Sequence, residues 1–171
     1  RSETTVKVFD QMRKLQGFTD EGSPGRDWNV ATGMVIEGKA GFQIMGDWAK
    51  GEFTAAGKVP GVDYYCAATP SNNGYLYNVD SFIFYKTSDP DKQEGQKLLA
   101  KLMMGKNFQK VFNLYKGSIP ARLDVPMDEF DKCAKTSNSD IKTAGASGGL
   151  VPSFAHGMAQ GNTMKAALQD V

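Results

Sequence analysis

Residues 36–53 read IEGKAGFQIMGDWAKGEF, and this passage joins the pattern of a strand to that of a helix. From 40 to 45, small and apolar residues alternate in the manner of a buried β-strand. Asp47 follows at once and is a suitable N-cap for a helix over 48–56. The passage therefore predicts a strand that runs directly into a helix, with the Trp48 indole exposed at the junction.

The same two patterns recur on both sides of this passage. Apolar spacing and capping residues predict further helices at 2–17, 27–38, 90–104, 106–115, 130–143 and 163–171. Strands are expected at 64–68 and at 81–85, which has the strongest strand pattern in the sequence, and 144–149 is expected to be a loop of small residues. Because strands alternate with helices, the predicted fold class is α/β.

Composition and charge exclude several classes of protein. The chain has 171 residues, and 20 Lys+Arg against 19 Asp+Glu give a formal net charge of +1, so it lacks the basic footprint of a nucleic-acid-binding protein. No apolar run approaches the roughly 20 residues that a membrane-spanning helix needs. With 40% hydrophobic residues, the chain has enough apolar surface to fold. Length alone indicates one domain.

The two cysteines, Cys66 and Cys133, allow a single pairing. If they are bonded, they point to an oxidising compartment. Two unpaired buried thiols are the alternative, and the spacing of the cysteines leaves both open. No signal peptide is visible at the start of the chain.

Motifs of enzymes and metal sites are weak. Residues 145–149, GASGG, satisfy the G-x-S-x-G pattern of serine hydrolases, but the preceding residues are polar and helical. His156, the only histidine, follows Ser147 after nine positions with no acid between them. One histidine and two distant cysteines cannot supply a transition-metal site either. We therefore expect no catalytic residues, no cofactor and no metal ion.

Binding of a carbohydrate fits the residues better. A sugar site needs an aromatic platform for the C–H faces, with carboxylates, amides and cations around the hydroxyl rim. Trp48 can supply the platform, and Asn78, Asp80, Lys116 and His156 can supply the rim. Each has a structural alternative: a core tryptophan, a turn formed by Asn and Asp, a lysine that complements a helix dipole, and a histidine in a surface loop.

These segments also resemble a known family. Residues 36–53 resemble the hallmark segment of extracellular solute-binding proteins of the family 1 sugar type, the substrate receptors of ABC importers. FNLYKGSIPARLDV at 112–125 and SFAHG at 153–157 are similar to the glucose-binding members. The resemblance covers essentially the whole chain.

The resemblance implies a periplasmic-binding-protein-like (type II) fold, in which two hinged α/β lobes close on a sugar and present the closed form to a membrane permease. Residues 1–78 and 125–171 would belong to the second lobe. Residues 79–124, a strand plus a helical hairpin, would belong to the first lobe. The implied location is periplasmic, or secreted at the outer face of the membrane.

The resemblance also implies roles for single residues. It places substrate-binding side chains at six positions: Trp48, Asn78, Asp80, Lys116, Arg122 and His156. Among these, Trp48 would stack on the sugar, Asp80 and Lys116 would bind hydroxyls, and His156 would add a polar contact. The resemblance further favours a disulfide between Cys66 and Cys133.

The chain departs from the family pattern in one respect, since nothing corresponds to the N-terminal half. We therefore expect the C-terminal portion of a two-lobed receptor, which alone binds sugar weakly or not at all. The expected partners are a monosaccharide, with glucose first, the ABC permease subunits and the missing N-terminal half. The alternative is a carbohydrate-active hydrolase, with Asp47 and Asp80 as its paired carboxylates.

Overall fold

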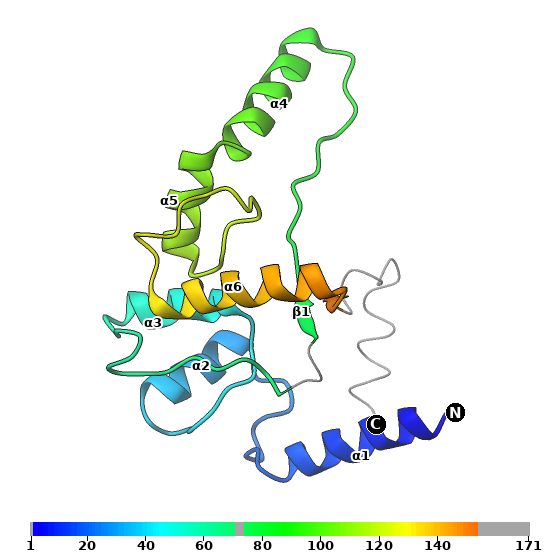
Figure 1. The fold of residues 1–171 in the computed structure, drawn as a ribbon, viewed down its shortest axis with the longest axis vertical. Helices are drawn as coiled ribbons and strands as arrows, with labels where there is room; N and C mark the ends of the chain where they lie inside the picture. Colours follow the sequence, from blue (N-terminus) through cyan, green and yellow to red (C-terminus); the bar gives the residue numbers. More distant parts are fainter. Residues whose placement is uncertain (1, 71–73, 154–171) are drawn as a thin grey trace. The chain divides into compact units, whose positions relative to one another are not determined.

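The computed structural model describes residues 2–70 and 74–153, and the chain forms two compact units, Arg1–Gln43 and Ile44–Val171. The first unit contains α1 (Glu3–Gln16) and α2 (Trp28–Ile36), drawn in blue in Figure 1. Ser2 caps α1 by accepting the N–H of Thr5, and Asp27 caps α2 by accepting the N–H of Trp28. Both helices confirm the prediction from sequence.

The second unit contains one 3-10 turn, four helices and two strands among its described residues. In chain order these elements are η1 (Asp47–Ala49), α3 (Lys50–Ala55), β1 (Tyr75–Tyr77), α4 (Pro90–Met103), α5 (Lys106–Lys116), α6 (Lys132–Ser147) and β2 (Leu150–Pro152). The helical hairpin of α4 and α5 was expected; Asp89 caps α4, and Pro90 is its first residue.

The two short strands pair in parallel, although 72 residues separate Tyr77 from Leu150 in the chain. Tyr75 lies opposite Leu150, and Tyr77 lies opposite Pro152. A parallel pair needs a long crossover, which α4, α5 and α6 supply here. The carboxyl ends of β1 and β2 therefore lie at the same edge of this small sheet.

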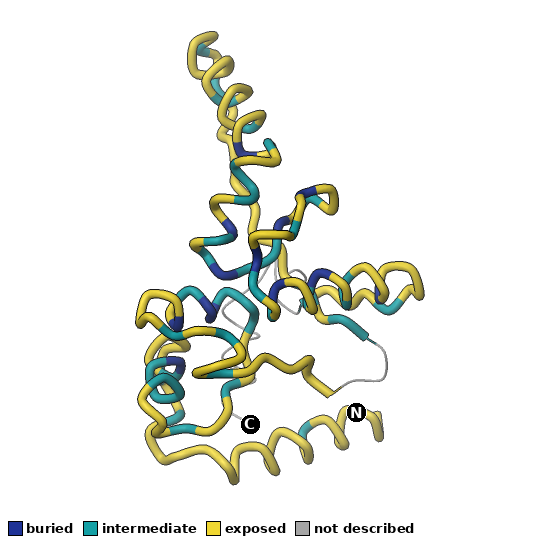
Figure 2. The backbone as a smooth tube through the Cα atoms, turned by 60° about the vertical axis from the view of Figure 1, so that its left-hand side comes forward, coloured by how far each residue is buried: buried dark blue, intermediate teal, exposed yellow. Residues whose placement is uncertain are grey.

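The core of the second unit lies at the start of α6. Val125, Phe130 and Ala134 are its buried members, and Leu114, Ile119 and Met127 pack against them. Figure 2 shows buried residues on α5, on α6 and on the segment between them, whereas most of α4 is exposed. The core thus holds the end of α5 against the start of α6.

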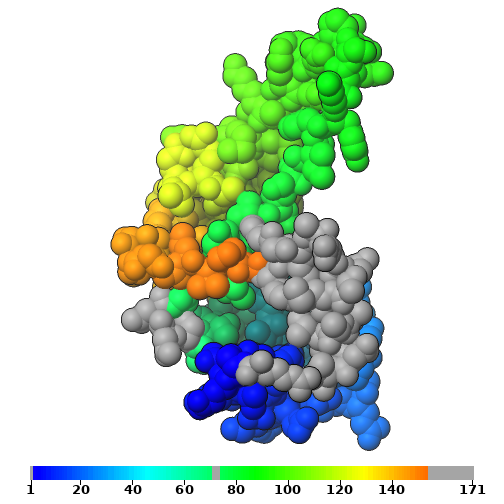
Figure 3. Space-filling view, turned by 90° about the vertical axis from the view of Figure 1, so that its right-hand side faces the viewer, coloured from blue at the N-terminus to red at the C-terminus, as the bar shows by residue number. Residues whose placement is uncertain are grey.

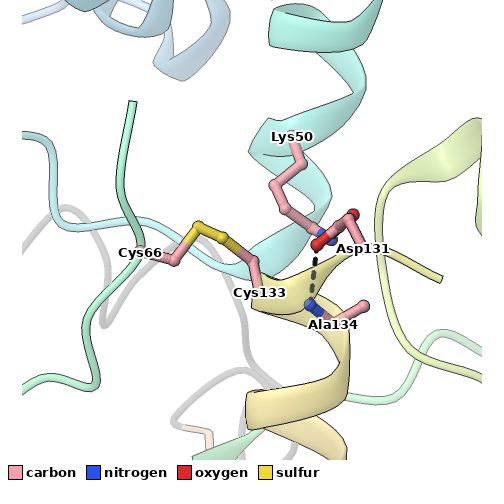
Figure 4. The surroundings of a disulfide bond; sticks show 5 residues. All are labelled: Lys50, Cys66, Asp131, Cys133 and Ala134. Atoms are coloured by element: carbon pink, nitrogen blue, oxygen red, sulfur yellow. Dashed lines mark hydrogen bonds and ion pairs between the residues drawn. A yellow bond between two sulfur atoms is a disulfide. The ribbon is translucent and has the colours of Figure 1, made fainter. Parts of the chain in front are cut away.

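A disulfide and an ion pair fasten the start of α6 to other elements (Figure 4). Cys66 and Cys133 are bonded, which settles the choice between a bond and free thiols. Lys50 of α3 is buried and donates to Asp131 Oδ2 at 2.6 Å, while Asp131 Oδ1 accepts the N–H of Ala134 and caps α6. Burial alone would raise the pKa of Asp131. The hydrogen bond and charge of Lys50, together with the backbone N–H groups of the α6 cap, outweigh burial and lower the pKa below its usual value.

Three predicted strands are wrong. Residues 40–45, 64–68 and 81–85 form no strand, because among the described residues their backbones make no ladder beyond a single bridge between Tyr64 and Pro60. Their apolar side chains are mostly exposed instead of buried; Phe42 is 95% exposed and Ile83 is 78% exposed. The end of α6 also differs from the prediction. The predicted loop at 144–149 begins inside α6, which ends at Ser147, and Gly148 then adopts the left-handed conformation that terminates it.

The segment 81–88 is extended and runs beside α4. Gln96 donates to the carbonyl of Tyr85 at 2.8 Å, and Gln93 donates to the carbonyl of Thr87 at 2.7 Å. Figure 3 shows these two stretches together as the green atoms. Side chains from both stretches expose apolar area, among them Ile83, Tyr85, Leu98 and Leu102.

The predicted helix at 163–171 lies outside the described residues. The described residues therefore contain helices and strands, as predicted, but their only sheet has two strands, neither of which was predicted.

Candidate functional site

Two polar residues follow the ends of the parallel strands. Asn78 comes directly after β1 and Ser153 directly after β2, so both lie at the carboxyl edge of the sheet. The Ser153 hydroxyl donates to Asn78 Oδ1 at 2.9 Å. In open α/β folds, ligands bind beyond the carboxyl ends of parallel strands, so this edge is the place where a ligand site is expected.

Asp80 and Lys116 extend this edge. Asn78 Nδ2 donates to Asp80 Oδ1 at 3.3 Å, and Lys116 Nζ donates to Asp80 Oδ2 at 2.7 Å. We call Asn78, Asp80, Lys116 and Ser153 the carboxyl-edge cluster. Three of its four members were predicted from the sequence, and the structure links them in one chain of hydrogen bonds.

The charged pair of this cluster is open to solvent. The Asp80 side chain is 70% exposed and that of Lys116 is 32% exposed. Lys116 is the last residue of α5, which also places its ammonium where it complements the helix dipole. An exposed pair of this kind contributes only about 0–1 kcal/mol to stability, so its members can exchange partners at small cost.

Trp48 lies in η1 at the start of α3. Its indole lies across Gly46, because a Cβ on Gly46 would overlap the ring. The expected role of Asp47 as the cap of this helix is wrong. Asp47 is the first residue of η1, and its Oδ2 accepts the N–H of Ile119 at 3.0 Å. The Asp47 carboxylate therefore links the Trp48 segment to the turn that follows Lys116.

One predicted site residue, Arg122, has other partners. Arg122 makes a bidentate pair with Asp124, at 2.8 and 2.7 Å, and also donates to the carbonyl of Met104. The structure thus does not join Arg122 to the carboxyl-edge cluster. His156 lies outside the described residues.

The sequence did not predict two residues at or near the site, Tyr75 and Ser153. The Tyr75 hydroxyl is 2.6 Å from Ser137 Oγ, which ties β1 to α6; burial raises its pKa, and the charges of Asp47 and Asp140 raise it further. Ser153 belongs to the cluster itself. A three-residue strand gives almost no periodic signal, so only knowledge of the β1–β2 pairing places Ser153 beside Asn78.

The hydrolase pattern at 145–149 is not supported by the geometry. Ser147 lies in the last turn of α6, and its hydroxyl donates to the carbonyl of Ala144 at 3.2 Å. A nucleophilic serine of this motif requires a preceding strand and an exposed hydroxyl. Among residues 2–70 and 74–153, no three acidic, cysteine or histidine residues gather as a metal site would require.

Comparisons with known proteins identify the family. Residues 1–143 match the family described as bacterial extracellular solute-binding protein. A probable sugar-binding periplasmic protein of Brucella suis is 47% identical over 171 residues, which is 99% of this chain and 40% of that protein.

More distant relatives come from archaea. An uncharacterised ABC transporter extracellular-binding protein of Pyrococcus horikoshii is 31% identical over 98% of this chain and 37% of its own length. A xylose/arabinose-binding protein of Haloferax volcanii is 30% identical over 90% of this chain and 33% of its own length.

The chain spans about 40% of the length of its bacterial relatives. The part of it that the structure describes contains no helix with the length and apolar character of a membrane span. The location expected from the resemblance, outside the cytoplasm, is confirmed by the extracellular family. The same match confirms the resemblance on which the fold and the site were predicted: this chain belongs to the bacterial extracellular solute-binding proteins.

Proposed function

We propose that this chain is part of the substrate receptor of an ABC sugar importer and contributes part of a monosaccharide site. The observation that carries the proposal is the carboxyl-edge cluster, with Trp48 on the neighbouring segment. A carboxylate, an amide, a hydroxyl and an ammonium together offer acceptors and donors for the hydroxyls of a sugar. Each internal hydrogen bond of the cluster can be replaced by one to the ligand.

The relatives support a sugar as the ligand. Bacterial relatives are named probable sugar-binding periplasmic proteins, and the Haloferax relative is named a xylose/arabinose-binding protein. A hexose, with glucose first, is our proposed ligand for this chain, and the membrane permease of the importer is the proposed partner of its closed form. The family is one of binding proteins, so it does not favour the hydrolase with Asp47 and Asp80 as catalytic carboxylates.

We further propose that residues 79–124 belong to a different lobe from residues 1–78 and 125–171, that the two lobes join where Leu114 and Ile119 pack against the core at the start of α6, and that the remainder of a longer receptor covers the apolar side chains of 79–124. Two observations support this arrangement. The segment 81–85 and α4 expose large apolar side chains that soluble proteins normally bury. The relatives are more than twice as long as this chain, so they contain residues that can cover this surface.

Calorimetry tests the proposed function. The intact receptor, meaning this chain together with the rest of the length found in its relatives, is titrated with glucose, galactose, mannose, xylose and arabinose. Saturable binding of glucose, stronger than that of the pentoses, is the expected result. Absence of heat with all five sugars would refute the proposed function, and preference for a pentose would refute the hexose assignment.

The two-lobed arrangement has a separate test. The 171-residue chain expressed alone should bind glucose far more weakly than the intact receptor, because half of a cleft leaves one face of the sugar in water. If the chain alone binds with micromolar affinity, the missing half is not needed and this part of the proposal is wrong.

A further inference from the structure

Asp47 makes a contact that its place in the sequence does not predict. Its Oδ2 accepts the N–H of Ile119 at 3.0 Å, across 72 residues of chain. The carboxyl is largely removed from solvent, and this burial raises its pKa, whereas the Ile119 N–H and the charges of Lys50 and Lys116 act in the opposite direction. A buried carboxylate that accepts a backbone N–H holds that backbone firmly, because an unpaired partner would be costly to bury.

A second contact joins the same two segments. A Cβ on Gly117 would lie 2.6 Å from the backbone nitrogen of Gly51, and a Cβ on Gly51 would lie 2.9 Å from the carbonyl oxygen of Lys116. Gly117 also has φ of +90°, which a residue with a side chain rarely adopts. The start of α3 and the end of α5 therefore meet backbone to backbone.

These contacts lie on either side of two proposed sugar-binding residues. Asp47 precedes Trp48 directly, and Ile119 follows Lys116 by three residues. The hydrogen bond between Asp47 and Ile119 therefore joins the backbone segment that carries the Trp48 indole to the segment that carries the Lys116 ammonium. If this hydrogen bond is lost, the backbone at 117–119 loses its link to the segment that carries Trp48.

We propose that Asp47 is a positioning residue of the sugar site: by holding the 117–119 turn against the start of α3, it fixes the Lys116 ammonium relative to the Trp48 indole. This inference rests on the proposed function and deepens it. Asp47 itself need not touch the sugar. The close approach of Gly51 and Gly117 acts in the same direction and holds the two segments together.

A binding experiment on the intact receptor separates this role from a purely structural one. Asp47→Ala removes the acceptor, Asp47→Asn keeps an oxygen that can accept the Ile119 N–H, and Glu52→Ala is the control because Glu52 is an exposed acid on α3. Glucose affinity is measured for each variant and again in a Lys116→Met background. Circular dichroism checks that each variant is folded.

The expected result is a pattern of affinities. Asp47→Ala weakens glucose binding about tenfold, whereas Asp47→Asn and Glu52→Ala change it by less than about threefold. In the Lys116→Met background the effect of Asp47→Ala falls to about twofold or less, because the residue through which Asp47 acts is already gone. Equal affinities for Asp47→Ala and Glu52→Ala, or fully additive losses with Lys116→Met, would overturn the proposal.

A second variant covers the case in which Asp47→Ala does not fold. Gly51→Ala forces the Lys116 carbonyl away and should weaken binding in the same Lys116-dependent manner, while Gly33→Ala, which meets no atom within 4 Å outside its own helix backbone, should not. If Gly51→Ala binds glucose as tightly as the wild type, the positioning role is wrong.

Failure of the proposed function can be distinguished from failure of this inference. If the intact wild type binds no monosaccharide, the proposed function fails, and the fluorescence of Trp48 without ligand then decides the positioning role. In a Trp28→Phe background, Trp48 is the remaining tryptophan of these 171 residues. A matched Trp48→Phe receptor supplies the emission of any tryptophan elsewhere in the protein, which is subtracted. Asp47→Ala should shift its emission and raise its quenching by acrylamide, and Glu52→Ala should not. Identical emission and quenching in the two variants would refute the inference.

Discussion

Loss of the disulfide between Cys66 and Cys133 should lower the stability of the protein by a predictable amount. The perturbation is the double substitution Cys66→Ser with Cys133→Ser, which removes the bond and leaves small polar side chains. The bond closes a loop with a sequence separation of 67 residues. It also fixes the segment after α3 to the start of α6, where the second unit has its core.

The size of the effect follows from loop closure. In the chain-entropy model, a loop of this length costs the unfolded state an entropy that corresponds to about 4 kcal/mol at 25 °C. The bond lies next to the Lys50–Asp131 pair and the α6 cap, which hold the same junction without it. We therefore expect the folded state of the variant to keep its structure, and the change to appear in the free energy of unfolding.

Urea denaturation of the intact receptor, followed by circular dichroism, measures this effect. The oxidised wild type should exceed the double variant by about 4 kcal/mol in the free energy of unfolding. Reductant should lower the wild type to the level of the variant and leave the variant unchanged. A difference below about 1 kcal/mol would refute the loop-closure account of the disulfide.

Three further predictions concern single residues. Asp131→Ala should cost about 3 kcal/mol by urea denaturation, because it leaves the buried Lys50 ammonium, only 7% exposed, without its partner and removes the cap of α6; a loss under about 1 kcal/mol would contradict this. Gly33→Ala should raise the free energy of unfolding by about 0.5–1 kcal/mol, since the added methyl group meets nothing and the unfolded chain loses freedom; destabilisation would count against it. Burial raises the pKa of Asp47 above its ordinary 3.8, so the folded state binds a proton on this carboxyl more tightly than the unfolded state does. Protonation of Asp47 therefore stabilises the folded protein below pH 3.8, and this stabilisation is lost as the pH rises through the raised pKa. Urea titrations at several pH values should therefore show the wild type losing stability relative to Asp47→Asn over that range, and a constant difference would refute the assignment.

The helices could be predicted because their signals are local. Ser2, Asp27 and Asp89 each cap the helix that the sequence analysis placed after them, and Gly117 ends α5 in the left-handed conformation. A capping side chain and its N–H partners lie within three residues of each other. Such signals can be read without knowing the rest of the fold.

The strands could not be predicted for the opposite reason. Segment 81–85 has the apolar residues of a strand, but a strand exists only when another strand supplies its hydrogen bonds. The pair that does form, β1 with β2, depends on contacts between residues more than 70 positions apart. Apolar alternation reports the tendency of a segment and carries no information about its partner.

The candidate site divides in the same way. Asp80 and Lys116 were predicted from residue type and from the family resemblance, and the structure joins them in an ion pair. Ser153 and the role of Asp47 depend on pairings between distant segments, so residue type alone could not reveal them. Asp47 was interpreted as a helix cap because a helix pattern follows it, but it is not the cap residue of that helix, and its carboxylate accepts the distant N–H of Ile119.

One titration tests the central claim most directly. Glucose is titrated by calorimetry into the intact receptor as the wild type, as Asp80→Asn, and as Asp10→Asn, which removes an exposed carboxylate on α1. The account predicts that Asp80→Asn binds about ten- to a hundredfold more weakly than the wild type, because hydroxyls lose a charged acceptor, and that Asp10→Asn binds as the wild type does. Glucose binding that is equally tight in all three proteins would show that the carboxyl-edge cluster is not the sugar site.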